Sequence, residues 1–301
     1  MNGVLVVDKP YGPTSFDVVH RLRSLLRLKK AGHTGTLDPA ATGVLPICLG
    51  EATKIAGFIT EGDKAYDAVF ALGVETDTLD AVGKVTSEAP VPLLTQTLLE
   101  GALEQFRGPI LQVPPMYSAI KIKGKRLYEL ARQGEEVERP AREVTVHALR
   151  LLDFSATELT VSVRCSKGFF VRSLAQDVGR ALGCGGHLKA LRRTQSGPFT
   201  LTQSLGLDLL ATWVEEGPAG LAALQQRLVP LAQALVELPA LEVHGEDIAR
   251  VAHGVPLEVS PSLEGQRLRL LGPEGRLLAV AESVRGRLRY LRVMNDTGGE
   301  G

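Results

Sequence analysis

The hydrophobic and polar positions in the first 200 residues follow two periods, one typical of strands and one typical of helices. Between residues 64 and 72, Tyr66, Phe70 and Leu72 fall on one side of a two-residue alternation, which predicts a strand. Thr14 stands three residues before Asp17, an arrangement typical of a capping box that opens a helix. By the same reasoning, helices are expected over 16–28, 52–60, 95–106, 125–133 and 169–182, and strands over 3–7, 64–72, 117–123, 143–152 and 158–166. This mixture favours an α+β fold with a mixed or antiparallel sheet flanked by helices.

Residues 31–50 show neither period, although regular elements are expected on both sides of them. Long irregular loops are uncommon inside compact domains and are usually functional. We therefore expect a functional loop at 31–50.

The pattern changes after residue 200. Ala- and Leu-rich helices are expected over 205–236 and a further helix over 245–253, followed by short strands near 266–271, 276–282 and 287–293. This change predicts a large domain over 1–237, a small β-rich domain over 238–295 and a disordered tail over 296–301.

Charge is balanced overall but unevenly distributed. The 34 basic and 34 acidic residues cancel, which excludes a strongly polybasic binder and leaves room for local basic surfaces. Basic clusters occur at 20–30, 121–142, 189–193 and 285–292. One such cluster is typical of a solvated face, whereas four in a neutral protein favour a face that binds a polyanion. On the last predicted strand, alternation places Arg285, Arg287 and Arg289 on one face and Arg292 on the other.

The three cysteines, Cys48, Cys165 and Cys184, form no CxxC pair and cannot build a disulfide framework. The N-terminus lacks the pattern of a secretory signal, and no run approaches 18 consecutive apolar residues. A reducing, cytoplasmic compartment is therefore expected, with no membrane association.

Several kinds of catalytic site are missing from the sequence. It contains no phosphate-binding P-loop, no Gly-x-Ser-x-Gly elbow and no His, Cys, Asp and Glu cluster with the spacing of a metal site. What remains within 31–50 is one carboxylate, Asp38, in a Gly- and Thr-rich turn before Pro39. From its surroundings alone, Asp38 is more typical of an Asx turn, which the Asp-Pro sequence favours.

Four long motifs, in order, resemble those of the TruB family of tRNA pseudouridine synthases. They are VDKPYGPTS (7–15), AGHTGTLDPAATGVLPICLGEATK (31–54), GDKAYDAVFALGVETDTLDAVG (62–83) and GFFVRSLAQDVGRALGCGGHLKALRRTQSGPF (168–199). The resemblance covers residues 3–200, and the small C-terminal domain resembles a PUA RNA-binding domain. It implies the pseudouridine-synthase fold, with the catalytic domain over 1–237 and the PUA-like domain over 238–295.

The resemblance also implies a reaction. Members of the family convert uridine 55 in the T loop of tRNA to pseudouridine, by detaching the base from C1′ and rejoining it through C5. Asp38 matches the nucleophile, and the choice between attack on C6 and on C1′ stays open. The target base must be flipped out of the RNA. The expected partner is the tRNA T stem-loop, and neither a metal, a cofactor nor an obligatory protein partner is implied.

Further site residues are implied by position within the motifs. Arg172 matches the arginine that pairs with the catalytic aspartate, although alone it reads equally as a surface arginine in solvent. Tyr66 matches the tyrosine that stacks on the target base, and it also fits a core aromatic. His33 matches a histidine that helps displace the target nucleotide, and Leu191 a leucine that lines the pocket. Phe170 replaces the tyrosine that the family commonly has, so its ring can stack but has no hydroxyl.

Two other function classes fit the same motifs. One is a tRNA binder or folding chaperone without catalysis, and the intact Asp38, Tyr66 and Arg172 argue against that as the sole role. The other is a synthase that acts on other RNAs with guide RNAs and partner proteins, and the chain lacks the long charged tails that such proteins often carry.

Overall fold

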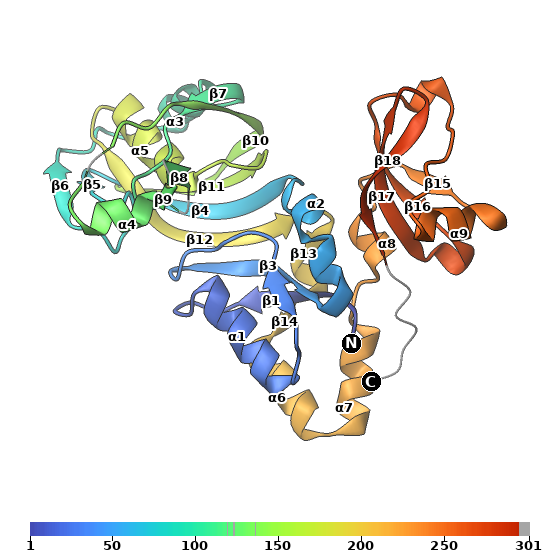
Figure 1. Cartoon of the computed structure of the whole chain (residues 1–301). Helices are drawn as coiled ribbons and strands as arrows, with labels where there is room; N and C mark the ends of the chain where they lie inside the picture. Colours follow the sequence, from blue (N-terminus) through green and yellow to red (C-terminus); the bar gives the residue numbers. More distant parts are fainter. Residues whose placement is uncertain (119, 123, 136, 295–301) are drawn as a thin grey trace. The chain divides into compact units, whose positions relative to one another are not determined.

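The computed structural model describes residues 1–118, 120–122, 124–135 and 137–294 and shows an α+β protein (Figure 1). The chain forms two compact units, each assembled from separate stretches of sequence. The first contains Met1–Pro39, Gly43–Gly62 and the chain from Ser196 onward, and the second contains Ala40–Thr42 and Asp63–Gln195. Parallel and antiparallel strand pairs both occur, so the prediction of an α+β fold with a mixed sheet is confirmed. In the described part of the chain, no helix has the length and apolar character needed to span a membrane.

Two apolar strands organise the first unit. β1 (Gly3–Lys9) runs antiparallel to β3 (Ala41–Leu49), with Val6 opposite Pro46. β2 (Ala31–His33) borders β3, and β14 (Leu205–Gly206) runs parallel to β1. The other elements that this unit contains before residue 238 are α1 (Ser15–Leu25), η1 (Gly50–Lys54), α2 (Ala56–Thr60), β13 (Phe199–Thr200), η2 (Leu201–Gln203), α6 (Leu207–Glu215), α7 (Pro218–Gln226) and α8 (Leu231–Ala234). The capping box predicted for α1 is present, because the Thr14 side chain accepts from the backbone of Asp17 and the Asp17 side chain accepts from that of Thr14.

The prediction of an irregular loop over 31–50 is wrong at both of its ends, which β2 and β3 occupy. All residues of β3 except Thr42 are buried. A strand that is covered on both faces has no alternation of polar and apolar positions, so the two-residue period is missing from its sequence. The irregular segment is confined to residues 34–40, which include Asp38.

The second unit contains a run of five strands in the order β12–β4–β11–β10–β7. These are β12 (Gly186–Ser196), β4 (Lys64–Leu72), β11 (Glu158–Cys165), β10 (Arg142–Phe154) and β7 (Gly108–Gln112). Two short hairpins and three helices accompany them: β5 (Val74–Thr76) with β6 (Val85–Glu88), β8 (Lys121–Ile122) with β9 (Lys125–Arg126), and α3 (Gln96–Glu104), α4 (Leu127–Arg132) and α5 (Val171–Ala181). The strand predicted over 64–72 and the hairpin of β10 and β11 are confirmed.

β12 was not among the predicted strands. Its sequence is rich in charged residues, and its adjacent positions Lys189 and Ala190 are both exposed, so apolar and polar positions do not alternate. Within it, Arg193 is buried. The basic cluster at 189–193 is therefore not a uniform surface patch, because one of its three cations lies inside the protein.

The C-terminal part of the first unit is a four-stranded sheet in the order β15–β16–β17–β18. Its elements are β15 (Ala240–Glu242), α9 (Glu246–Ala252), η3 (Pro261–Leu263), β16 (Arg267–Leu271), η4 (Pro273–Gly275), β17 (Leu277–Val284) and β18 (Arg287–Val293). One side of the sheet has its own apolar core, while Leu277 and Val280 join a core that also contains Val4 and Phe199. The β-rich C-terminal segment is thus confirmed, and the boundary at 237/238 stays a prediction. The tail predicted over 296–301 lies outside the described residues.

One helix approaches a strand so closely that a side chain has no room. A Cβ placed on Gly179 of α5 would lie 2.3 Å from the backbone carbon of Gly185 and 2.4 Å from the nitrogen of Gly186. Backbone atoms cannot swing aside as the end of a flexible side chain can. This contact fixes α5 against the start of β12, and α5 carries Arg172.

We predict that Gly179→Ala lowers the free energy of unfolding by about 1–3 kcal/mol, because the added methyl overpacks a backbone contact. Gly101→Ala on α3 is the matched control, since a Cβ there meets nothing within 4 Å. The control should raise stability by up to about 1 kcal/mol through helix propensity. Urea unfolding measures both changes, and equal stability of the two variants would contradict the close approach.

Candidate active site

The Asp38 segment, residues 34–40, is held by its backbone. The Ser15 hydroxyl donates to the Leu37 carbonyl at 3.0 Å and accepts from the Leu37 amide at 2.8 Å. The Gly12 amide donates to the Pro39 carbonyl at 2.9 Å. Both residues that flank Asp38 are therefore tied to the start of α1 and the loop before it, and this fixes the backbone position of Asp38.

Lys9 is fully buried and takes part in the same support. Its Nζ donates to the carbonyls of Pro10 at 3.0 Å and Pro39 at 3.2 Å. A buried ammonium needs such acceptors, since taking it out of water without them is costly. The second of these bonds holds Pro39, directly after Asp38, against the end of β1.

His33 lies at the end of β2, just before the Asp38 segment, and is half-buried. Its Nδ1 accepts a hydrogen bond from the Gly35 amide at 3.3 Å. An imidazole nitrogen that accepts carries no proton, so this contact assigns the proton of neutral His33 to Nε2. The ring is thereby oriented by the chain that follows it.

In the second unit, Tyr66 lies on β4 and is 9% exposed. Its buried neighbours on the same face are Ala68 and Phe70, as the alternation predicts. Its hydroxyl is hydrogen-bonded to the guanidinium of Arg193 on β12, which is 1% exposed. Burial lowers the pKa of Arg193, while the contact with Tyr66 opposes that shift. Tyr66 is therefore both a core aromatic and the partner of a buried cation.

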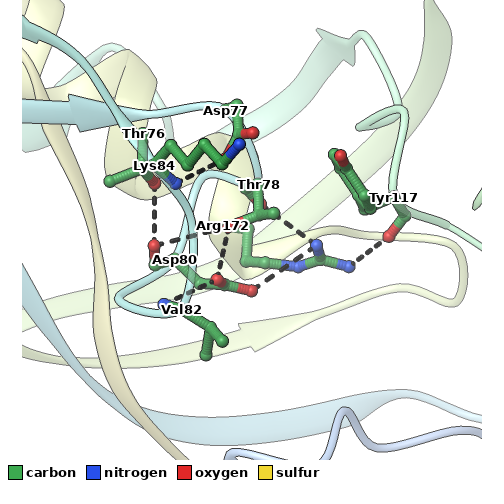
Figure 2. Close-up of polar contacts among 8 residues, drawn as sticks. All are labelled: Thr76, Asp77, Thr78, Asp80, Val82, Lys84, Tyr117 and Arg172. Atoms are coloured by element: carbon green, nitrogen blue, oxygen red, sulfur yellow. Dashed lines mark hydrogen bonds and ion pairs between the residues drawn. The ribbon is translucent and has the colours of Figure 1, made fainter. Parts of the chain in front are cut away.

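Arg172 is the second residue of α5 and is 7% exposed, which excludes the alternative of a surface arginine in solvent. Its Nη1 donates to the Thr78 carbonyl at 3.1 Å and lies 3.7 Å from Oδ2 of Asp80. Its Nη2 donates to the Tyr117 carbonyl at 2.8 Å (Figure 2). The carboxylate and the two carbonyls offset both the burial of this cation and its unfavourable place in the first turn of a helix.

The loop that presents Asp80 explains the TDTLDAVG motif residue by residue (Figure 2). Asp80 Oδ1 accepts from the Thr78 hydroxyl at 2.6 Å and from the Val82 amide at 3.1 Å. The Thr76 hydroxyl donates to the Asp80 carbonyl at 2.7 Å. A Cβ on Gly83 would lie 2.3 Å from Oγ1 of Thr78, so this turn requires glycine. Thr78 and the Val82 amide thus hold the carboxylate that faces Arg172, and Thr76 holds the backbone of the same residue, Asp80.

Phe170 immediately precedes α5 and is half-buried. The side-chain amide of Gln112 binds its backbone on both sides, accepting from the Phe170 amide at 2.7 Å and donating to its carbonyl at 3.0 Å. Leu191 is half-buried on β12, and its carbonyl accepts from the Thr42 hydroxyl at 3.5 Å. Both residues are held through their backbone groups.

The structure places the six expected site residues in two groups. Asp38 and His33 belong to the first unit, and Tyr66, Phe170, Arg172 and Leu191 belong to the second. The pairing of Asp38 with Arg172 stays a prediction, as do the roles of the other residues. Among the residues that the structure describes, no three His, Cys, Asp or Glu side chains lie together as metal ligands would.

Asp80 and Arg193 are two buried or half-buried partners that the sequence reasoning did not single out. Asp80 lies within the motif at 62–83, whose resemblance to the family implies a role for Tyr66 alone. Arg193 was counted as a surface cation of the cluster at 189–193. A signal for Asp80 did exist, because an arginine in the first turn of a helix calls for a nearby carboxylate.

The C-terminal arginines differ from their predicted arrangement. Arg285 precedes β18 in a turn with φ of +54°, so it does not share the strand. The irregularity in the register of β17 and β18 pairs Arg289 with Glu282 and Arg292 with Val280. Residues 280 and 282 are two apart and share a face, so the prediction that Arg292 projects from the opposite side is wrong.

Acidic partners also reach most of these arginines. Glu258 lies 3.3 Å from Arg287, and Glu282 contacts Arg289. Hydrogen bonds from the Arg285 and Gly286 amides lower the pKa of Glu264, and the charge of Arg285 lowers it further. Of the four, only Arg292 has no acidic partner among the described residues. Folding brings these acids beside the arginines, so the cluster at 285–292 carries less free positive charge than its sequence suggests.

The comparisons with known proteins agree with the fold and the motifs. Residues 23–171 match the model of the TruB family pseudouridylate synthase N-terminal domain, and residues 172–236 match that of the tRNA pseudouridylate synthase B C-terminal domain. The tRNA pseudouridine synthase B of Dechloromonas aromatica is 48% identical over 96% of this chain and 94% of its own, and that of Symbiobacterium thermophilum is 52% identical over 85% and 83%.

Solved structures carry the same fold. The structure of a Cbf5–Nop10–Gar1 complex aligns with a TM-score of 0.79 at 27% identity, over 97% of this chain and 84% of that one. Fold and sequence together define the chain as a pseudouridylate synthase. Within that class, the chain belongs to the TruB family, as its motifs implied.

We predict that Asp80→Asn lowers the free energy of unfolding by about 1–3 kcal/mol, because it removes the charge that faces the buried Arg172 while keeping the shape of the side chain. Asp77→Asn is the matched control in the same loop: Asp77 is exposed, and its Oδ1 accepts only a backbone hydrogen bond, from Lys84 at 2.8 Å, that an amide oxygen can also accept. Urea unfolding of both variants is the measurement. Equal losses would show that the charge of Asp80 does not stabilise Arg172.

Proposed function

We propose that this protein converts uridine 55 in the T loop of tRNA to pseudouridine, with Asp38 as the nucleophile. The observation that carries the proposal is the Asp38 segment itself, which keeps the family motif and whose backbone is bonded on both sides of the carboxylate. A nucleophile must be held in line with the atom it attacks, and this arrangement leaves little freedom to its backbone.

The reaction balances without a co-reactant. The C1′–N1 bond breaks, the base rotates, and a C1′–C5 bond forms, while the proton on C5 leaves and N1 gains one. A carboxylate suits this sequence, because it can add to C1′ of the ribose or to C6 of the base and later depart. No oxidant, water or leaving group is consumed, so we expect neither a metal nor a cofactor to be needed.

The residues of the second unit fit supporting roles. Tyr66 is proposed to stack on the uracil ring and to accept the proton from C5, with Arg193 fixing its hydroxyl. Arg172 directs two of its five N–H donors at carbonyls, which orients the guanidinium that is proposed to pair with Asp38. His33 is proposed to help displace the target nucleotide, and Phe170 and Leu191 to line the pocket.

The target base has to be made accessible before the reaction can begin. Reaching C5 of a stacked uridine requires flipping it out, at a few kcal/mol. Recognition of the T stem-loop is expected through its shape and phosphates rather than through a long base sequence. We expect the reaction in the cytoplasm, without an obligatory protein partner.

Asp38→Asn should abolish pseudouridine formation, because the amide keeps the shape of the side chain and loses the nucleophile. The measurement maps pseudouridine in an unmodified tRNA transcript incubated with the protein in EDTA. Asp208→Asn is the control, since the Asp208 side chain is 99% exposed. Turnover by Asp38→Asn at a tenth of the wild-type rate would contradict the nucleophile, and absence of pseudouridine with wild-type protein would contradict the function.

The C-terminal sheet is proposed to contribute a phosphate contact through Arg292. Arg292→Gln should weaken tRNA binding and lower the log–log salt slope by about 0.7–0.9, as expected for one lost phosphate contact. Arg287→Gln should change the slope less, because Glu258 already neutralises Arg287. These point changes are preferable to deletion of 238–301, which would uncover the core shared with Val4. Equal slopes for wild type and Arg292→Gln would make Arg292 a solvated residue.

A further inference from the structure

Two large aromatic rings stand exposed beside the Asp38 segment. Tyr11 is 71% exposed and Phe16 is 67% exposed. Among the aromatic side chains that the structure describes, only Phe154 is also exposed, at 38%. Exposed rings five residues apart are therefore unusual for this protein, which has only 5% aromatic residues and buries or half-buries most of them.

The backbone connects both rings to the site. Gly12, directly after Tyr11, donates to the Pro39 carbonyl, and Ser15, directly before Phe16, bonds to both backbone groups of Leu37. Gly12 has φ of +109°, a conformation that turns the chain between the two rings and that other residues rarely adopt. The rings thus stand on residues directly next to those that hold the Asp38 segment.

Phe16 also begins a mixed aromatic and basic face on α1. Phe16, His20 and Arg23 stand at positions i, i+4 and i+7, so they lie on one side of the helix, and all three are exposed. The opposite side carries the buried residues Val18, Val19 and Leu22. Together with Tyr11, these three exposed residues define what we call the α1 face.

The charge around the α1 face is positive. Arg27, Lys29 and Lys30 follow the helix and are exposed. The acid in this stretch, Asp17, accepts hydrogen bonds from Thr14 within the capping box, and those bonds lower its pKa. The helix dipole also stabilises cations near the C-terminus of α1. That effect does not explain the two exposed rings near its N-terminus.

Resting on the proposed function, we propose that the α1 face binds an unpaired nucleotide of the RNA substrate adjacent to the target uridine. Tyr11 and Phe16 stack on base faces, and Arg23 contacts a phosphate. Every base offers a π face, so stacking on a protein ring tolerates any sequence, and basic residues beside the ring follow the backbone. A positive surface with exposed rings complements a polyanion with exposed bases, and this pairing favours RNA over a protein partner.

The test measures the dissociation constant of an unmodified tRNA transcript at several salt concentrations. Phe16→Ala and Tyr11→Ala should each weaken binding on the order of tenfold without changing the salt slope, because a stacked ring carries no charge. Phe16→Trp should retain binding, since it keeps a ring. Arg23→Gln should lower the log–log slope by about 0.7–0.9. The loss in the ring variants is expected mainly in binding, with a smaller fall in the single-turnover rate at saturating RNA.

Leu209→Ala is the control for loss of an exposed apolar side chain, because Leu209 is 43% exposed on α6 of the same unit. Ring variants that bind within twofold of this control would overturn the proposal, as would Phe16→Trp that binds as weakly as Phe16→Ala. A wild-type protein that binds the transcript and forms no pseudouridine would contradict the proposed function but not the binding role of the α1 face. Binding by the variants is scored independently of that result.

Discussion

The position of Asp38 depends on a small set of hydrogen bonds to the backbone of its neighbours. A serine hydroxyl that both donates to and accepts from Leu37 acts as a short cross-link between α1 and the Asp38 segment. The buried ammonium of Lys9 adds a second link at Pro39, on the other side of the carboxylate. Because these partners bind carbonyl and amide groups, they define the path of the chain on both sides of Asp38.

The second unit buries two guanidinium groups, and each of them needs partners that replace water. Arg172 and Arg193 are each less than a tenth exposed, and an unpaired buried cation would be strongly destabilising. The structure surrounds Arg172 with two carbonyls and the Asp80 carboxylate, and it places Arg193 against the Tyr66 hydroxyl. Thr76, Thr78 and the Val82 amide of the TDTLDAVG motif hold Asp80, so this part of the motif supports the burial of Arg172.

Much of the fold could be predicted where side chains alternate or where a cap is present, as in β4, the β10–β11 hairpin and α1. The prediction failed for β3, which is buried on both faces, and for β12, in which buried and exposed positions do not alternate. The candidate site residues came from the resemblance of motifs, since Asp38 alone fits a turn. The place of Arg172 in the first turn of α5 indicates that it needs a carboxylate. Which carboxylate this is, and which residue pairs with Arg193, depend on which distant segments the fold brings together.

The discontinuous make-up of the first unit has a consequence for how the protein is made. Its strand β1 comes from the N-terminus, while β14 and the core residues Phe199 and Val280 come from the last third of the chain. During synthesis, domains generally fold as their residues emerge, but this unit lacks part of its core until late in translation. The Asp38 segment emerges early, yet the unit that carries it is completed only when the C-terminal strands have left the ribosome.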